Sequence, residues 1–323
     1  MAKNLTAYLL SLFILACEQP FDPRAPLDAQ MVVFSIISTD RDVQFVRVQG
    51  TYMAPDVDAA SYTSDNSVKD AIVSIRASNG VYFTRDTLLA RPDTGRYKFP
   101  LYAYVLNPFT PERGRSYEVI VQSASRGQAF ATVIVPGQPT LSIPTYETKR
   151  VLENSRNYAD NVPLLFPVVL SPNAKGYVAR LLLYYDVLKA KQWEEERVEI
   201  PVMSADPSRY GLYLPRYPQM ALIPSTSEVG IVFRNGYYNA VIRNVRYVYP
   251  SNRIIFKWAT FVLLQADRNL YDYFSVTHAG RDPWSIRFDE AMVSRMEGGL
   301  GIVGAYTLDS LVNILPSNFW GNQ

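Results

Sequence analysis

The segment Ala71–Ala77, with the sequence AIVSIRA, shows the clearest strand pattern in this chain. Successive side chains of a β-strand point to opposite faces of the sheet. Val73 and Ile75, together with the two flanking alanines, would share one face, while Ser74 and Arg76 would share the other. An apolar face opposite a polar one predicts a β-strand that is buried on one side.

Similar alternation continues on both sides of this segment. Further strands are expected at residues 31–37, 43–49, 117–121 and 130–135. The run Pro136-Gly137-Gln138-Pro139 ends the series, because proline cannot donate the hydrogen bond that a strand ladder needs. Short antiparallel strands separated by turns are typical of an immunoglobulin- or fibronectin-like sandwich, and we assign this sandwich to residues 29–137.

Residues 138–323 are expected to form a second, larger antiparallel β domain. Segments 177–187 and 241–249 alternate as strands do, and segment 254–264 is apolar on both faces, which predicts a central strand. Leu270, Tyr273 and Phe274 then fall at positions i, i+3 and i+4, and Gly280 follows as a helix-ending glycine. The expected fold class is therefore all-β, with one short helix in the second domain.

Bulk composition limits the classes of function. The 323 residues are enough for two domains of ordinary size. The 32 Lys and Arg residues nearly balance the 30 Asp and Glu residues, so nucleic acid is not expected as a partner. Cys17 is the one cysteine, which leaves the cores without disulfide support.

Ile14-Leu15-Ala16-Cys17 reads as a lipobox after the apolar run 5–16. Lys3 supplies a positive n-region, and the run is too short for a membrane span of about 20 residues. We expect a signal peptide at 1–16, lipidation of Cys17 and a proline-rich tether at 17–28. The protein would then be anchored to a bacterial membrane by its lipid. The alternative is an ordinary secretory signal with a cysteine beside the cleavage site by chance.

Gly299-Leu300-Gly301-Ile302-Val303-Gly304 matches the dinucleotide-binding spacing G-x-G-x-x-G. That fingerprint belongs to a βαβ unit, and the chain has no alternating βα pattern. We interpret the segment as a closing strand whose glycines permit a bulge or a close approach of two backbones. No cofactor is expected.

No catalytic or metal-binding group is predicted. His278 is the one histidine, and nothing in the spacing selects Ser275 or Ser285, with Asp282, as its partners in a catalytic relay. We interpret it as a histidine near a helix end, where the helix dipole stabilises it. Zinc is not expected without further imidazole or thiol ligands. Glu194-Glu195-Glu196 is interpreted as a solvated loop or strand edge.

Aromatic residues gather in the second half of the chain. Exposed rings stack on sugars or peptides, although most aromatic residues pack in cores. The residues of a candidate ligand platform are Tyr237, Tyr238, Trp258 and Trp284.

Several motifs together resemble the Bacteroidota lipoproteins of domain-of-unknown-function family 4249. They are the lipobox, MVVFSIIS at 31–38, VKDAIV at 68–73, GRSY at 114–117, the helical segment 270–274 and GGLGIVGAY at 298–306. The resemblance covers nearly the whole mature chain. It implies attachment to the outer membrane and, by association, work beside a TonB-dependent β-barrel transporter. The family has no established catalytic residues, so the resemblance implies none here.

The expected function is that of a non-enzymatic, outer-membrane lipoprotein that acts as a binding or accessory subunit. The face of the membrane, periplasmic or cell-surface, is left open. One alternative is a surface hydrolase acting on glycan or peptide, which would need a cleft with two carboxylates. Another is a structural envelope protein, which would need neither a cleft nor a ligand.

Overall fold

The computed structural model describes residues 28–53, 63–91, 98–142, 144–153, 155–202, 217–249, 253–278 and 295–312. Cys17, the signal peptide 1–16 and nearly all of the tether lie outside the described residues, as does Trp284. Within the described residues the structure is mostly β, with short helices added, which confirms the predicted fold class.

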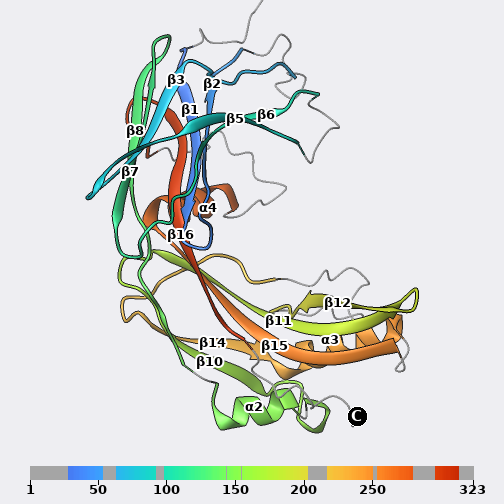
Figure 1. Ribbon diagram of the computed structural model, residues 1–323. Coiled ribbons are helices and arrows are strands. Elements are labelled where there is room, and N and C mark those ends of the chain that lie inside the picture. The colour runs from blue at the N-terminus through green and yellow to red at the C-terminus, as the bar shows by residue number, and fades with distance from the viewer. Residues whose placement is uncertain are drawn as a thin grey trace, which may run out of the picture.

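The first half of the chain forms two facing layers of strands, which confirms the predicted sandwich architecture (Figure 1). One layer holds β1 (Met31–Ser38), β2 (Gln44–Gly50), β6 (Leu101–Leu106) and β5 (Arg85–Leu89). The other layer is a four-stranded sheet of β4 (Gly80–Phe83), β3 (Ala71–Ala77), β7 (Ser116–Ser123) and β8 (Gly127–Ile134). Val73 and Ile75 are buried between the layers, as their alternation in the sequence predicts.

The second half extends the first layer into one nine-stranded sheet. Its strands are β11 (Gly176–Lys189), β12 (Gln192–Glu199), β13 (Ala221–Leu222), β15 (Ile254–Ala266) and β16 (Leu300–Leu311). The strand order is β12-β11-β15-β16-β1-β2-β6-β5, with β13 paired to β11. β15 is therefore a central strand, as predicted from its two apolar faces.

Smaller elements cover one face of β11 and β15. A three-stranded sheet comprises β9 (Thr140–Leu141), β10 (Pro163–Val169) and β14 (Glu228–Arg234). The helical elements of the described residues are α2 (Tyr146–Glu153), the 3-10 turn Ser155–Asn157, α3 (Asn235–Val248) and α4 (Arg268–His278). A second hydrophobic core lies among β10, β14, α3 and this face of the large sheet. The predicted short helix is α4, whereas α2 and α3 were not anticipated.

The prediction of a strand at residues 241–249 is wrong, because most of this segment belongs to α3. Tyr238, Val241, Ile242 and Val245 are buried, and they follow the i, i+3, i+4, i+7 spacing of a helix face. Within nine residues the apolar positions also fit a period of two. The longer window that starts at residue 235 resolves the ambiguity in favour of a helix.

The last strand joins the two halves of the chain. β16 pairs in parallel with β1, and further along it pairs antiparallel with β15. In Figure 1 it runs from the upper half of the molecule to the lower half. Val303 and Ala305 pack in the sandwich core, and Leu311 packs against the second core. The domain boundary at residues 137 and 138 stays a prediction, and the hydrogen-bonded sheet runs across it.

A close contact of two backbones holds β16 against β1. Gly301 has φ +112°, and a Cβ built on it would lie 2.1 Å from the carbonyl oxygen of Val33. No side chain fits there, so glycine is required both by the backbone conformation and by the space. This confirms the interpretation of the glycine-rich segment as a strand with a close backbone approach.

Asp267 closes the β15–β16 ladder and starts α4. Its carboxylate oxygen Oδ1 accepts hydrogen bonds from the backbone N–H groups of Leu270 (2.9 Å) and Ala305 (3.0 Å). Its own N–H donates to the carbonyl of Ala305. Burial raises the pKa of Asp267 from 3.8 to about 6, although these backbone N–H groups act in the opposite direction.

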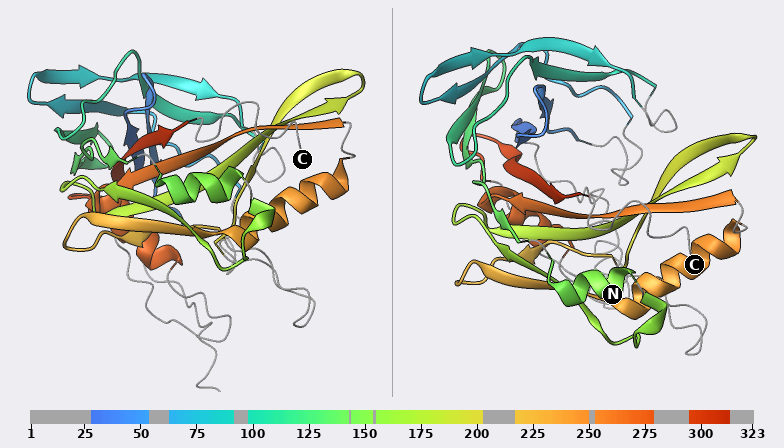
Figure 2. Two further views of the ribbon diagram at one scale, coloured as in Figure 1. Left: turned by 90° about the horizontal axis from the view of Figure 1, so that it is seen from below. Right: turned by 60° about the horizontal axis from the view of Figure 1, so that its bottom comes forward.

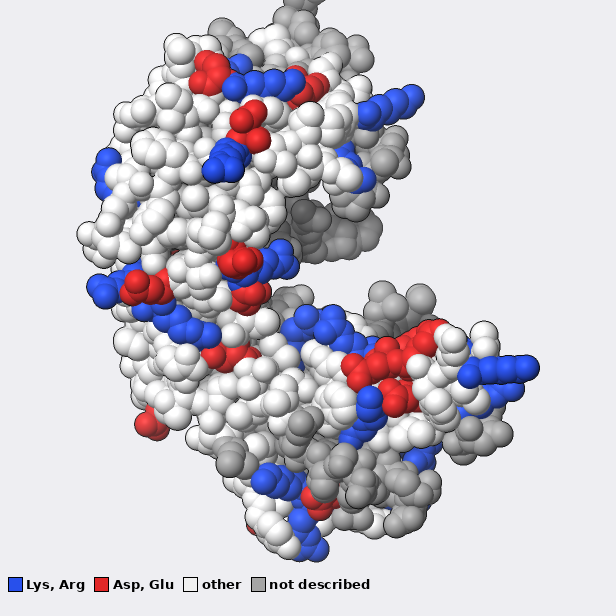
Figure 3. Space-filling view, in the orientation of Figure 1, with Lys and Arg blue, Asp and Glu red and all other residues white. Residues whose placement is uncertain are grey.

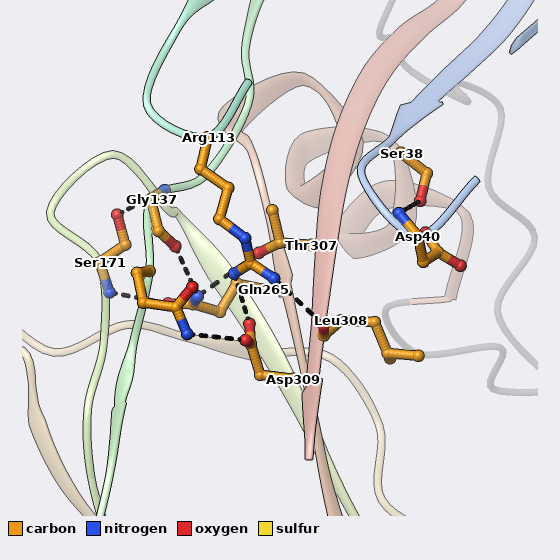
Figure 4. A network of polar contacts seen from close by, with 10 residues as sticks. Ser38, Asp40, Arg113, Gly137, Ser171, Gln265, Thr307, Leu308 and Asp309 are labelled. Atoms are coloured by element: carbon orange, nitrogen blue, oxygen red, sulfur yellow. Dashed lines mark hydrogen bonds and ion pairs between the residues drawn. The ribbon is translucent and has the colours of Figure 1, made fainter. Parts of the chain in front are cut away.

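A polar network fixes the junction between the halves (Figure 4). The buried side chain of Gln265 accepts a hydrogen bond from Ser171 N (2.7 Å) and donates to Gly137 O (3.2 Å). Beside it, Asp309 of β16 forms an ion pair with Arg113 (2.7 Å). Connecting segments from both predicted domains are therefore held by side chains of β15 and β16.

Gly301→Ala is expected to lower the free energy of unfolding by about 3–5 kcal/mol, because the added methyl group adds a clash to the backbone strain. Gly127→Ala is the matched control. Gly127 also has a positive φ, +78°, but nothing lies within 4 Å of the added Cβ. Gly127→Ala should therefore lower the free energy of unfolding by about 1 kcal/mol, through backbone strain alone. Urea denaturation measures both, and equal losses would contradict the role given to Gly301.

Asp267→Asn is expected to remove a pH dependence of stability. The pKa of Asp267 is higher in the folded than in the unfolded state, so the folded state binds the proton more tightly. The contribution of Asp267 to the free energy of unfolding should therefore fall by about 3 kcal/mol as the pH rises from about 4 to about 6. Asparagine keeps the capping oxygen and does not titrate. Urea denaturation from pH 4 to 7 tests this, and parallel pH profiles for the two proteins would refute it.

Candidate functional site: a groove on the open face of the large sheet

A groove of about 860 Å³ lies on the face of β11, β15 and β16 that points away from the second core. Phe261 and Leu263 of β15 face that core, so Thr260, Val262 and Leu264 face the groove. Figure 3 shows the molecule hollowed between its two halves, with charges of both signs gathered over the β11–β12 hairpin. The candidate site is therefore a sheet face with an apolar floor.

Strand register places the groove residues in rows across the floor. Arg180, Val262 and Ser310 form one row, because Arg180 pairs with Val262 and Val262 pairs with Ser310. Val178, Leu264 and Leu308 form the next row along the groove. Residues directly opposite each other on paired strands share a face, so these side chains lie side by side.

The charged residues of the groove come from β11 and β12. Arg180 forms an ion pair with Glu199, which raises the pKa of Arg180. Arg197 lies directly opposite Tyr184 on the paired strand and is exposed. No hydrogen-bond or ion-pair partner of Arg197 is found among the described residues. Among the described lining residues, its guanidinium is therefore the charge that no ion pair neutralises.

Thr260 is a buried polar residue in the floor. Its side chain is 4% exposed, and its hydroxyl finds no hydrogen-bond partner within the described part of the chain. A buried hydroxyl that makes no hydrogen bond costs about 1–3 kcal/mol. The floor of the groove therefore contains an unsatisfied, buried hydroxyl.

Trp258 borders the groove at its β12 end. Its ring stacks on Tyr184, with centroids 5.7 Å apart, and Lys257 Nζ lies 4.6 Å from the ring centroid. Lys257 is in turn held by Asp186 (3.2 Å) and Glu195 (3.0 Å), and these ion pairs raise its pKa. The indole thus contacts Tyr184 of β11 and the ammonium group of Lys257.

A second cavity of about 590 Å³ continues the groove at the other end. It shares Val178 and Leu264 with the groove, and α4 contributes Leu270, Tyr271 and Phe274. Its lining contains no charged residue among those that the structure describes. The two cavities together therefore have one charged end and one uncharged, aromatic end.

The structure separates the residues of the predicted ligand platform. Tyr238 is fully buried and Tyr237 packs against the second core, because the buried side chains of α3 belong to that core. Figure 2 shows α3 lying beside the large sheet. Trp258 lies on the opposite face of that sheet, in the groove lining. Of the predicted set, Trp258 alone lines the groove, and Trp284 lies outside the described residues.

Of the residues weighed for catalysis, Ser275 is the one whose side chain the structure describes. α4 ends at His278, Ser275 donates its hydroxyl to the carbonyl of Asp272, and Ser285 and Asp282 lie outside the described residues. No group of three or more His, Cys, Asp or Glu side chains suited to a metal ion occurs among the described residues. The run 194–196 lies in β12, the edge strand of the large sheet, which confirms its interpretation as a solvated edge.

Sequence reasoning missed Arg197, Thr260 and the Arg180–Glu199 pair as groove residues. Alternation along residues 177–187 and 254–264 indicates which side chains share a face of each strand. It does not show that the two strands are neighbours, or which of their faces is left uncovered. That information lies in long-range pairing.

Comparisons with known proteins leave the function open. No family model matches the chain, and no curated protein matches it. A solved C-terminal globular domain of an oligosaccharyltransferase from Pyrococcus abyssi is similar over 76% of this chain and 50% of that one, with 9% identity and a TM-score of 0.23. Trypsin-activated alpha-2-macroglobulin from Escherichia coli is similar over 76% of this chain and 15% of that one, with 8% identity and a TM-score of 0.20.

None of the helices in the described ranges combines the length and the apolar character that crossing a bilayer requires.

Thr260→Val is expected to raise the free energy of unfolding by about 1–2 kcal/mol, because it replaces an unsatisfied buried hydroxyl with a methyl group of similar size. Thr148→Val is the matched control. Thr148 is also buried, but its hydroxyl accepts from Leu165 N and donates to Leu165 O. Thr148→Val should lower the free energy of unfolding by about 1–2 kcal/mol, because it removes these hydrogen bonds. Thermal and urea denaturation measure both; a loss at Thr260→Val would contradict the unsatisfied hydroxyl.

Proposed function

We propose that this protein is an outer-membrane lipoprotein, anchored through Cys17, that acts as a non-enzymatic binding or accessory subunit. Its ligand or partner site is the groove on the open face of the large sheet. The membrane partner is a β-barrel transporter of the TonB-dependent kind. This last part rests on the resemblance to family 4249 lipoproteins.

The groove is the observation that carries the proposal. Its floor is an apolar sheet face on which large side chains are partly exposed to water, including Leu308 at 40% and Val312 at 62%. Contiguous exposed apolar surface in a soluble domain commonly marks a binding site. A structural envelope protein has no need of such a groove.

The charged residues of the groove favour binding over hydrolysis. A glycoside hydrolase needs two carboxyl groups, about 5–10 Å apart, on either side of the bond that it cleaves. The described lining has one carboxylate, Glu199, and that group is engaged by Arg180. The groove thus lacks a carboxylate pair among its described residues, which supports a binding role.

The tether constrains where the groove can act. A fully extended chain reaches about 3.5 Å per residue, so the residues from Cys17 to Asp28 span at most about 40 Å. The first described residue would therefore stay within about 40 Å of the bilayer surface. This distance suits contact with the exposed part of a membrane-embedded partner.

Purification of the tagged chain from native outer membranes in mild detergent tests the proposal. We expect wild type to co-purify with a β-barrel transporter, and Leu308→Glu, which places a charge on the groove floor, to lose it. Ile134→Glu is the matched control, because Ile134 is similarly exposed, at 44%, on β8 and outside the groove. Equal recovery of the partner with both variants would refute the role of the groove.

The same preparation tests the anchor. Cys17→Ala should leave the folded body intact and release it from membranes, because the tether separates the lipid from both cores. Gln19→Ala, which keeps the lipobox, should remain in the membrane fraction after a carbonate wash. Retention of the Cys17→Ala chain there would refute lipid anchoring.

A further inference from the structure

We propose that the groove and the adjoining cavity hold one anionic amphiphile, a molecule with a single apolar tail and a carboxylate or phosphate head. The inference rests on the proposed binding function and names the class of ligand. The head would lie beside Arg197 and Thr260. The tail would run along the floor into the cavity beside α4.

The dimensions of the floor suit an extended tail. Tyr184 and Val178 stand at its two ends on β11, six residues apart, which is about 20 Å along a strand. The floor is three strands wide, so its outer strands are about 10 Å apart. A slot with these proportions accommodates a long, thin molecule better than a compact one.

The far end of the slot favours an apolar group. The cavity beside α4 is lined by Phe274, Tyr271 and Leu270 from the helix and by Ile36 from β1. No charged side chain is among its described lining residues. Burial of apolar surface contributes about 25 cal/mol per Å², so an alkyl tail is stabilised along its whole length there.

The near end favours an anion. Arg180 and Glu199 neutralise each other, which leaves Arg197 as the unpaired charge in the described lining. Arginine binds carboxylate and phosphate through paired N–H donors. Charge complementarity therefore selects a negative head.

Thr260 provides a second, independent indication of a polar head at this end. Its unsatisfied hydroxyl is more than nine-tenths buried and lies in the groove lining. Leu182 pairs with Thr260 on one side and with Glu199 on the other, so Thr260 is in the same row as the charged wall. A hydrogen bond from this hydroxyl to an oxygen of the bound head would remove the cost of the buried hydroxyl.

An extended peptide fits this floor less well. A peptide about 20 Å long carries about six residues, each with a backbone N–H and C=O that need partners. The hydrogen-bonding side chains of the groove lie toward its Arg197 end, while the row of Val178, Leu264 and Leu308 offers none. An alkyl tail needs no hydrogen bonds at that row.

Calorimetric titration of the detergent-free, full-length Cys17→Ala chain tests the proposal. The probes are dodecanoate, dodecyl phosphate, dodecanol and inorganic phosphate, each below its micellar concentration. We expect the first two to bind and dodecanol to bind about ten-fold more weakly, which is the size of one charged hydrogen bond. Inorganic phosphate should not bind, because it lacks the tail. The two anionic probes distinguish a fatty-acid head from a phospholipid-like head.

Two variants localise the binding. Arg197→Gln should weaken dodecanoate about ten-fold and leave dodecanol unchanged. Leu308→Glu should weaken every amphiphile. Arg85→Gln is the control, because Arg85 is an exposed arginine on β5, outside both cavities. Equal binding of dodecanol and dodecanoate, an unaffected Arg197→Gln variant, or tighter binding of an acidic hexapeptide would overturn the proposal.

Failure here is distinguishable from failure of the proposed function. If no amphiphile binds but Leu308→Glu still loses the membrane partner, the groove binds a protein and the amphiphile inference is wrong. If amphiphiles bind as expected but the chain has neither anchor nor partner, the inference stands and the accessory role is wrong.

Discussion

The parallel pairing of β1 with β16 is the constraint on which the rest of the structure depends. It joins segments from near the two ends of the described chain, and it requires the backbone at Gly301 to approach Val33 more closely than any side chain allows. Through this pairing the sandwich layer and the strands of the second half become one sheet. One strand then contributes to both cores, so neither half can change its position without disturbing that sheet.

The orientation of α4 follows from the same strand. β15 ends at Ala266, and Asp267 replaces it as the partner of β16 by bonding both the N–H and the C=O of Ala305. The same carboxylate caps the helix that begins at Arg268, while Asn269 donates to the carbonyl of Val303. The end of a ladder therefore fixes the start of a helix, and that helix closes one end of the groove.

The open face of the sheet links this architecture to the proposed function. Its other face is covered by the sandwich core and by α3, β10 and β14. The groove side exposes apolar residues beside an ion pair and an arginine that has no ion-pair partner among the described residues. Exposed apolar surface is unfavourable in water, and an unsatisfied hydroxyl such as that of Thr260 adds to the cost. A ligand or partner that covers the groove removes both costs, which is the physical reason for placing the function there.

The alternation of apolar and polar residues determined the strands that have one or two buried faces, and the i, i+3, i+4 spacing determined the helix after residue 267. The glycines determined the closing strand. Side-chain periodicity and the conformational freedom of glycine are local properties, so the sequence shows them directly. It misassigned residues 241–249, where a short window fits two periods. The groove was decided by the tertiary structure alone. Arg197, Thr260 and Leu308 lie on three different strands, and their proximity depends on strand order and register. The register depends on which faces of the sheets and helices are buried against each other. The pattern along a single sequence does not show which of these faces pack together.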